Sequence, residues 1–97
     1  MEVTVYILRC SDGSYYTGLT RQEIEARVWE HNEGIHDGYT ARRRPVQLVF
    51  TETYDLLVEA IERERQIKGW TRAKKEALIA LAYERLPELA RNHQEIQ

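Results

Sequence analysis

The stretch from Val3 to Thr20 constrains the fold most, because two strand-forming runs flank a glycine turn there. The first run, Val3–Arg9, is β-branched and aromatic, and the second carries two tyrosines and a glycine. Asp12 and Gly13 between them are frequent hairpin-turn residues. The stretch is therefore predicted to be a β-hairpin.

The length of the turn decides which side chains of the hairpin share a face. A two-residue loop of Asp12-Gly13 puts Tyr6 and Tyr16 on opposite faces. A three-residue loop of Ser11–Gly13, with Gly13 left-handed, pairs Tyr6 with Gly18 and puts both tyrosines on one face. One residue of register exchanges the faces of every side chain. We predict the three-residue loop, with the phenols as diagonal neighbours and open space across from the Tyr6 ring.

Composition limits the classes of protein to which the chain can belong. Its 97 residues, 42% hydrophobic and 31% charged, are typical of one globular domain. The single cysteine, Cys10, excludes an internal disulfide framework and a cysteine zinc site. With no long apolar run and no signal peptide, a cytoplasmic protein without membrane partners is expected. The net charge of −2 argues against a purely charge-driven nucleic-acid binder, although local basic patches are compatible with it.

Periodicity and capping signals predict a helix and a strand after the hairpin. Thr20 and Glu23 form a T-x-x-E capping box for a helix from about Arg21 to Asn32 or Glu33. Gly34 follows as a stop signal. Val46–Tyr54 then alternates apolar and polar residues and is predicted to be a strand.

Two further helices complete the fold. Asp55 is the predicted N-cap of a helix through Lys68, and a third amphipathic helix is predicted over Thr71–Arg85. The order β-β-α-β-α-α predicts an α+β fold, with a small three-stranded, mainly antiparallel sheet and flanking helices. We assign residues 1–84 to one domain and expect residues 85–97, broken by Pro87, to be a partly disordered tail.

Three charged residues lie where they can face the sheet or the core. Arg27 and His31, at i,i+4, flank the apolar line of their helix, and Glu64 lies within the apolar stripe of the next helix. Ordinary roles exist for each: a pair of Arg27 with Glu23, a helix-dipole contact of His31, and a pair of Glu64 with Lys68. Together with two phenols, however, they provide the base, cation and carboxylate that phosphodiester hydrolysis uses.

These residues resemble the GIY-YIG nuclease superfamily, in particular its short, single-domain bacterial members. The resemblance covers about residues 2–80. The matching segments are Thr4-Val5-Tyr6 for Gly-Ile-Tyr, Tyr16-Thr17-Gly18 for Tyr-Ile-Gly, Arg27-x-x-x-His31 for the helix motif, His36–Pro45 for the loop, and Arg63–Lys68 for the metal-binding helix. Leu19 stands where many members carry a lysine.

The resemblance implies a role for each matched residue. Tyr6 is implied as the general base or its relay, with His31 accepting or sharing its proton, because a free phenol with a pKa of about 10 is only about 0.1% ionised at neutral pH. Tyr16 is implied to position the water or the phosphate, and Arg27 to stabilise phosphoryl charge. Glu64 is implied to hold one Mg²⁺ or Mn²⁺ ion.

The expected function is that of a metal-dependent endonuclease acting on DNA, in repair or processing, with RNA left open. No small-molecule cofactor is expected, and the oligomeric state is left open. One alternative is a nucleic-acid-binding module with little or no cleavage, and another is a protein-interaction domain that docks a partner through its third helix. The candidate phosphate contacts are Arg42, Arg43, Arg44, Arg72, Lys74 and Lys75.

Overall fold

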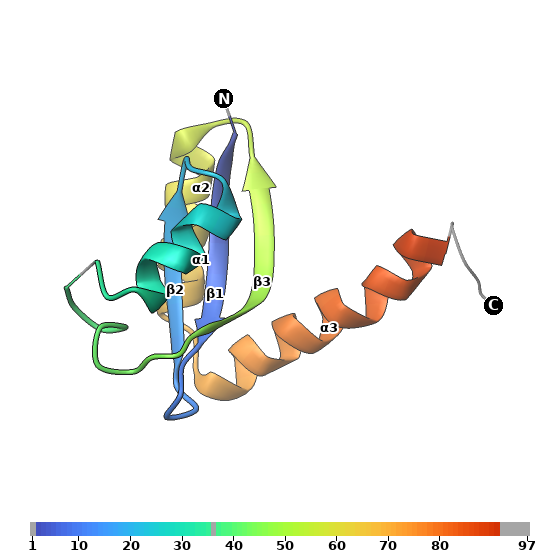
Figure 1. Ribbon diagram of the computed structural model, residues 1–97. Coiled ribbons are helices and arrows are strands. Elements are labelled where there is room, and N and C mark those ends of the chain that lie inside the picture. Colours follow the sequence, from blue (N-terminus) through green and yellow to red (C-terminus); the bar gives the residue numbers. More distant parts are fainter. Residues whose placement is uncertain (1, 36, 92–97) are drawn as a thin grey trace.

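The computed structural model describes residues 2–35 and 37–91 and confirms the α+β fold and the predicted order of elements. The sheet has three strands, and Figure 1 shows helices packed around it. The elements are β1 (Val3–Arg9), β2 (Tyr15–Thr20), α1 (Ile24–Asn32), β3 (Gln47–Tyr54), α2 (Leu57–Lys68) and α3 (Arg72–Arg91).

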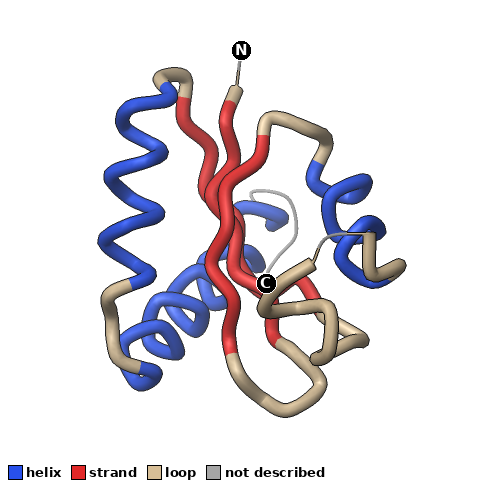
Figure 2. The backbone as a smooth tube through the Cα atoms, turned by 90° about the vertical axis from the view of Figure 1, so that its left-hand side faces the viewer, coloured by secondary structure: helices blue, strands red, loops and turns tan. Residues whose placement is uncertain are grey.

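Strand β1 lies at the centre of an antiparallel sheet of order β2-β1-β3 and contributes to a core on each face. On one face, Val5 and Ile7 pack with Ala60 and Ile67 of α2. On the other, Tyr6 belongs to the core that packs against α1. Figure 2 shows the sheet between these two helices. The alternation of side chains along β1 therefore assigns Tyr6 to the face that α1 covers.

The hairpin has the predicted three-residue loop. The amide of Cys10 donates to the carbonyl of Ser14 at 2.8 Å, and Gly13 between them has a φ of +84°. Tyr6 pairs with Gly18, as the odd register requires. The prediction that Tyr6 and Tyr16 share a face is confirmed, since their ring centroids lie 6.3 Å apart.

Two helices begin later than predicted. Helix α1 begins at Ile24 rather than Arg21, because Thr20 is the buried last residue of β2 and its hydroxyl accepts from the amide of Gln22 at 3.0 Å. The predicted capping box is therefore wrong. Asp55 does not cap α2 either, since the N-cap is Leu56 and it makes no side-chain cap. In both places the expected capping residue lies at the end of a strand or directly after it. The backbone is still extended there, so the helix begins later than the capping signal predicts.

Helix α3 is longer than predicted. It continues to Arg91, through Pro87, where the sequence predicted an end near Arg85. A proline removes one backbone donor from a helix, and the leucine, glutamate, alanine and arginine residues around it are strong helix formers. In Figure 1 the second half of α3 projects away from the sheet. Residues 92–97 of the expected tail lie outside the described part of the chain, and the boundary at residue 84 stays a prediction.

Candidate active site

A buried cluster joins β1 to α1 through three predicted site residues. The phenol oxygen of Tyr6 lies 2.9 Å from Nε2 of His31 and accepts a hydrogen bond from Nε of Arg27 at 3.2 Å. The Tyr6 side chain is fully buried and His31 is 3% exposed. Arg27 also pairs with Glu30 at 3.4 Å, rather than with Glu23 as its ordinary role predicted. The structure therefore brings Tyr6, Arg27 and His31 together.

The backbone of Gly18 forms the floor beneath the Tyr6 phenol. A Cβ at this position would lie 2.5 Å from both Cζ and Oη of Tyr6. The expected open space across from the ring is therefore wrong, because the phenol itself occupies the volume that a side chain would take. Glycine is required here by this close approach of a side chain to the strand.

We expect Gly18→Ala to lower the free energy of unfolding by about 1–3 kcal/mol, the usual cost of overpacking a core. The added methyl must displace the Tyr6 ring, whose atoms lie at 2.5 Å from its position. Thermal unfolding followed by circular dichroism measures the change. Gly69→Ala is the matched control, since its Cβ meets only backbone oxygens at 3.7 Å. Equal free energies of unfolding for the two variants would contradict the close contact between Gly18 and the Tyr6 ring.

The environment of Tyr6 keeps its proton bound. Burial raises the pKa of the Tyr6 phenol above its usual value of 10.0, and the hydrogen bond from Arg27 only partly opposes this effect. A free phenolate is consequently disfavoured before substrate binds. The 2.9 Å contact with His31 gives the phenol a neighbour that can take its proton during a reaction.

Tyr16 connects the buried cluster to the surface. Its ring centroid lies 5.3 Å from that of His31 and 6.1 Å from that of Tyr39, on which it stacks. Tyr39 is 41% exposed, and the guanidinium of Arg43 lies 3.9 Å from its ring centroid. Tyr16 itself is half-buried. Of the two motif phenols, it is therefore Tyr16 that reaches the surface.

Sequence reasoning missed two residues of this site. Tyr39 and Thr40 carry no predicted role, although the hydroxyl of Thr40 lies 2.7 Å from Nδ1 of His31. Both lie in the aperiodic loop after α1, where no spacing rule relates a residue to the sheet. His36, in the same loop, lies outside the described residues.

Glu64 is half-buried on α2, with its side chain 15% exposed and its carboxylate 2.8 Å from the ammonium of Lys68. This is the ordinary i,i+4 pair that the sequence also allowed. The hydrogen bond to Glu64 raises the pKa of Lys68. The observed contact of Glu64 is therefore with Lys68, and α2, which carries both residues, packs on the face of the sheet opposite to that of Tyr6.

The donor set around Glu64 fits a weakly held divalent ion. Within the described residues, no group of three or more His, Cys, Asp or Glu side chains converges on one point. One carboxylate that already attracts a cation is compatible with Mg²⁺ or Mn²⁺, because these hard ions accept water and phosphate oxygens as their other ligands. Glu64 is accordingly the residue that would hold such an ion.

Arg43 and Arg44 make hydrogen bonds within the protein, and Arg42 and Arg44 are exposed. Nε of Arg43 lies 3.0 Å from the Asp12 carboxylate in the hairpin loop. Nε of Arg44 donates to the carbonyl of Ala41 at 3.0 Å. Arg42 is exposed. Two of these three arginines therefore support the loop that carries Tyr39 and Thr40.

The second basic segment, Arg72–Lys75, also contacts the hairpin turn. Arg72 donates to the carbonyl of Gly13 at 2.6 Å and pairs with Glu76 at 3.1 Å. The ammonium of Lys74 lies 4.6 Å from the centroid of a Trp70 ring, and Lys75 is half-buried. The hairpin turn, through Asp12 and Gly13, thus contacts both basic segments.

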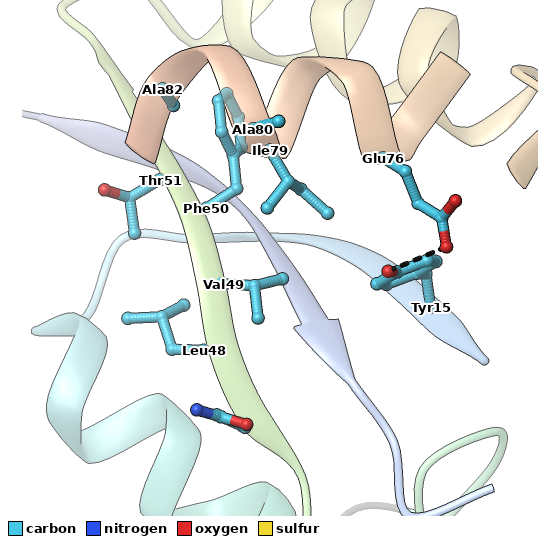
Figure 3. A pocket seen from close by; sticks show the side chains of 10 residues that line it. Tyr15, Leu48, Val49, Phe50, Thr51, Glu76, Ile79, Ala80 and Ala82 are labelled. Atoms are coloured by element: carbon cyan, nitrogen blue, oxygen red, sulfur yellow. Dashed lines mark hydrogen bonds between the residues drawn. The ribbon is translucent and has the colours of Figure 1, made fainter. Parts of the chain in front are cut away.

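A cavity of about 630 Å³ lies between β3 and α3 and is separate from the tyrosine cluster. Figure 3 shows its mainly apolar lining, with Phe50 and Ile79 among the side chains and Tyr15 donating a hydrogen bond to Glu76 at 3.2 Å. None of the residues lining it belongs to the predicted catalytic set.

Along the described part of the chain, no helix has both the length and the apolar character to cross a membrane.

Comparisons with known proteins find a matching family model and similar sequences. A family model described as the GIY-YIG catalytic domain matches residues 2–77. A UPF0213 protein of Staphylococcus aureus (strain Mu3) is 52% identical over 75 residues, which are 77% of this chain and 90% of that protein.

Two solved structures are also similar. The solution NMR structure of a UPF0213 protein from Bacillus halodurans is 41% identical with a TM-score of 0.55, covering 84% of this chain and 85% of that one. The NMR structure of a protein from E. faecalis is 34% identical with a TM-score of 0.60, covering 100% and 96% of the two chains.

Proposed function

Because the chain belongs to the GIY-YIG catalytic domain family, which is a family of nucleases, we propose that it is an endonuclease that hydrolyses phosphodiester bonds in DNA with the help of one divalent metal ion. The observation that carries this proposal is the buried contact of Tyr6 with His31 and Arg27, beside Tyr16. A role in DNA repair or processing, in the cytoplasm, is part of the proposal.

The nucleophile is a water molecule whose proton passes to the tyrosine cluster. Its oxygen bonds to phosphorus, the bond from phosphorus to the leaving oxygen breaks, and the leaving oxygen takes a proton from solvent. Tyr6 passes its own proton to Nε2 of His31, 2.9 Å away, and takes the proton of the water in the same exchange. The raised pKa of Tyr6 supports this relay over a preformed phenolate, because the phenol holds its proton until an acceptor is available.

Two other side chains act on the scissile phosphate. Arg27, whose side chain is 23% exposed, stabilises negative charge on the phosphoryl oxygens and on the oxygen of Tyr6. Tyr16 orients the water or the phosphate from its half-buried position. Glu64 would hold a divalent metal ion, which would supply further charge neutralisation at the phosphate.

The proposed contacts for the nucleic-acid backbone lie in the two basic segments next to the hairpin turn, Arg42–Arg44 and Arg72–Lys75. Arg42 and Lys74 are exposed. Arg43 and Arg72 are already bonded to the hairpin, so their main effect on binding is through the shape of the surface. Binding should weaken as salt rises, because phosphate contacts release counterions.

A plasmid-nicking assay with Mg²⁺ or Mn²⁺ tests the proposal. We expect Arg27→Gln to lower the cleavage rate by about 10²–10³-fold, the usual loss when one donor to a developing anion is removed. Arg21→Gln is the matched control, because Arg21 is exposed and precedes the helix. A chelator should abolish cleavage by the wild type.

The alternative function gives a different result in the same experiment. A nucleic-acid-binding module would retain salt-sensitive binding to plasmid, linear and branched DNA without any cleavage product at either metal. That outcome would overturn the proposed nuclease activity.

A further inference from the structure

The hydroxyl of Thr40 makes a buried contact with the far side of the His31 ring. Its oxygen lies 2.7 Å from Nδ1, while Nε2 of the same ring lies 2.9 Å from the Tyr6 phenol. Thr40 is 2% exposed and His31 is 3% exposed. His31 is therefore held between a loop hydroxyl and a strand phenol, in a place shielded from water.

The backbone around Thr40 is held in place by the turns of its own loop. The carbonyl of Thr40 accepts from the amide of Arg43 at 3.0 Å, and the amide of Ala41 donates to the carbonyl of Gly38 at 3.2 Å. The Arg43 side chain is in turn tied to Asp12 at 3.0 Å. The position of the hydroxyl is thus set by the turns of the loop and by its tie to the hairpin turn.

The direction of the hydrogen bonds follows from the donors present. Within the described residues the buried Tyr6 phenol bonds to Nε of Arg27, which can only donate, and to Nε2 of His31, so Nε2 is the acceptor for the phenol proton. In the neutral imidazole, an accepting Nε2 requires the proton to be on Nδ1. That proton then donates to the oxygen of Thr40. The opposite tautomer would put a proton on Nε2 and leave it unable to accept from Tyr6.

We propose that Thr40 is a positioning residue that keeps neutral His31 protonated on Nδ1, so that Nε2 can accept the proton of Tyr6. The catalytic consequence rests on the proposed nuclease function. Thr40 itself touches no substrate and acts through His31, as a buried carboxylate orients a catalytic histidine in other hydrolases.

Nitrogen NMR of the histidine side chains tests the tautomer without any cleavage assay. The ¹⁵N-labelled wild type is recorded at a pH at which histidine is neutral, and the three histidines are assigned with His36→Gln and His93→Gln. We expect His31 of the wild type and of Thr40→Ser to be protonated on Nδ1. Thr40→Val, which keeps the shape but loses the hydroxyl, should shift the population toward protonation on Nε2.

Cleavage kinetics test the consequence for the reaction. Thr40→Val should lower kcat on the order of 10- to 100-fold with little change in KM, as is typical for loss of a group that orients a functional histidine. Thr40→Ser should restore most of the rate. A purely structural role would instead lower the melting temperature and affect Ser and Val alike.

Each outcome has one meaning. If His31 of the wild type is protonated on Nε2, the inference is wrong, whether or not Thr40→Val folds. The inference is also wrong if Thr40→Val folds and has the tautomer and the cleavage rate of the wild type. A wild type that shows the Nδ1 proton but cuts no DNA overturns the proposed nuclease function and leaves the tautomer assignment in place.

Discussion

Replacing Glu64 by glutamine is expected to lower metal-dependent cleavage about a thousandfold with the fold unchanged. Loss of a metal's charge stabilisation costs several kcal/mol in the transition state, and about 4 kcal/mol corresponds to three powers of ten in rate. The effect on stability should be small, because Lys68, the partner of Glu64, is 56% exposed and such pairs contribute about 0–1 kcal/mol. Rate and melting temperature, measured on the same sample, separate these effects.

The matched control for this variant is Glu62→Gln. Glu62 lies on the same helix and is exposed. It should cut at the wild-type rate and bind Mn²⁺ as the wild type does in a calorimetric titration, whereas Glu64→Gln should bind Mn²⁺ more weakly. Equal Mn²⁺ affinity and equal rates for the two variants would show that Glu64 holds no ion.

Tyr6→Phe should lower the cleavage rate by about 10²–10⁴-fold, the range for loss of a proton-transfer group. DNA affinity should be unchanged, because the Tyr6 side chain is fully buried. Tyr15→Phe is the matched control, since Tyr15 bonds to Glu76 beside the separate cavity. Single-turnover cleavage and a binding titration measure the two quantities, and a Tyr6→Phe variant that cuts at the rate of Tyr15→Phe would contradict the relay.

The same variant has an expected pH dependence of stability. The pKa of Tyr6 is raised by burial in the folded protein, so the unfolded chain releases this proton first once the pH exceeds 10.0. The stabilisation is complete below pH 10 and is lost as the pH rises through the folded pKa. The free energy of unfolding of the wild type should therefore fall more steeply above pH 10 than that of Tyr6→Phe. Urea titrations at pH 8 and above pH 10 measure the difference.

Short-range rules were sufficient where neighbouring residues in the chain decide the geometry. Asp12 and Gly13 located the hairpin turn, and the three-residue loop chosen there gave the odd register. The i,i+4 spacing of Arg27 and His31 predicted that both face the sheet, where they contact the Tyr6 phenol. The position of Glu64 within an apolar stripe predicted a half-buried carboxylate with a partner, and the partner in the structure is the ammonium of Lys68. Each of these rests on the period of one strand or one helix.

Local capping rules failed where a strand and a helix compete for the same residues. Thr20 and Asp55 are favourable N-caps by type, but Thr20 ends a paired strand and the chain after Tyr54, the last residue of β3, is still extended at Leu56. The space at Gly18 was also misjudged, because only the packed Tyr6 ring shows what fills it. The energy of a packed neighbour exceeds these local preferences.

The amino-acid sequence by itself determined the order of the elements and the family motifs, because each depends on residues within a few positions of one another, and it limited the hairpin to two registers. Only the tertiary structure decided that Thr40 contacts His31 and that Tyr39 stacks on Tyr16. These contacts cross from an aperiodic loop to a helix and a strand. Their geometry depends on how the loop closes on the hairpin through Arg43 and Asp12, which no local period encodes.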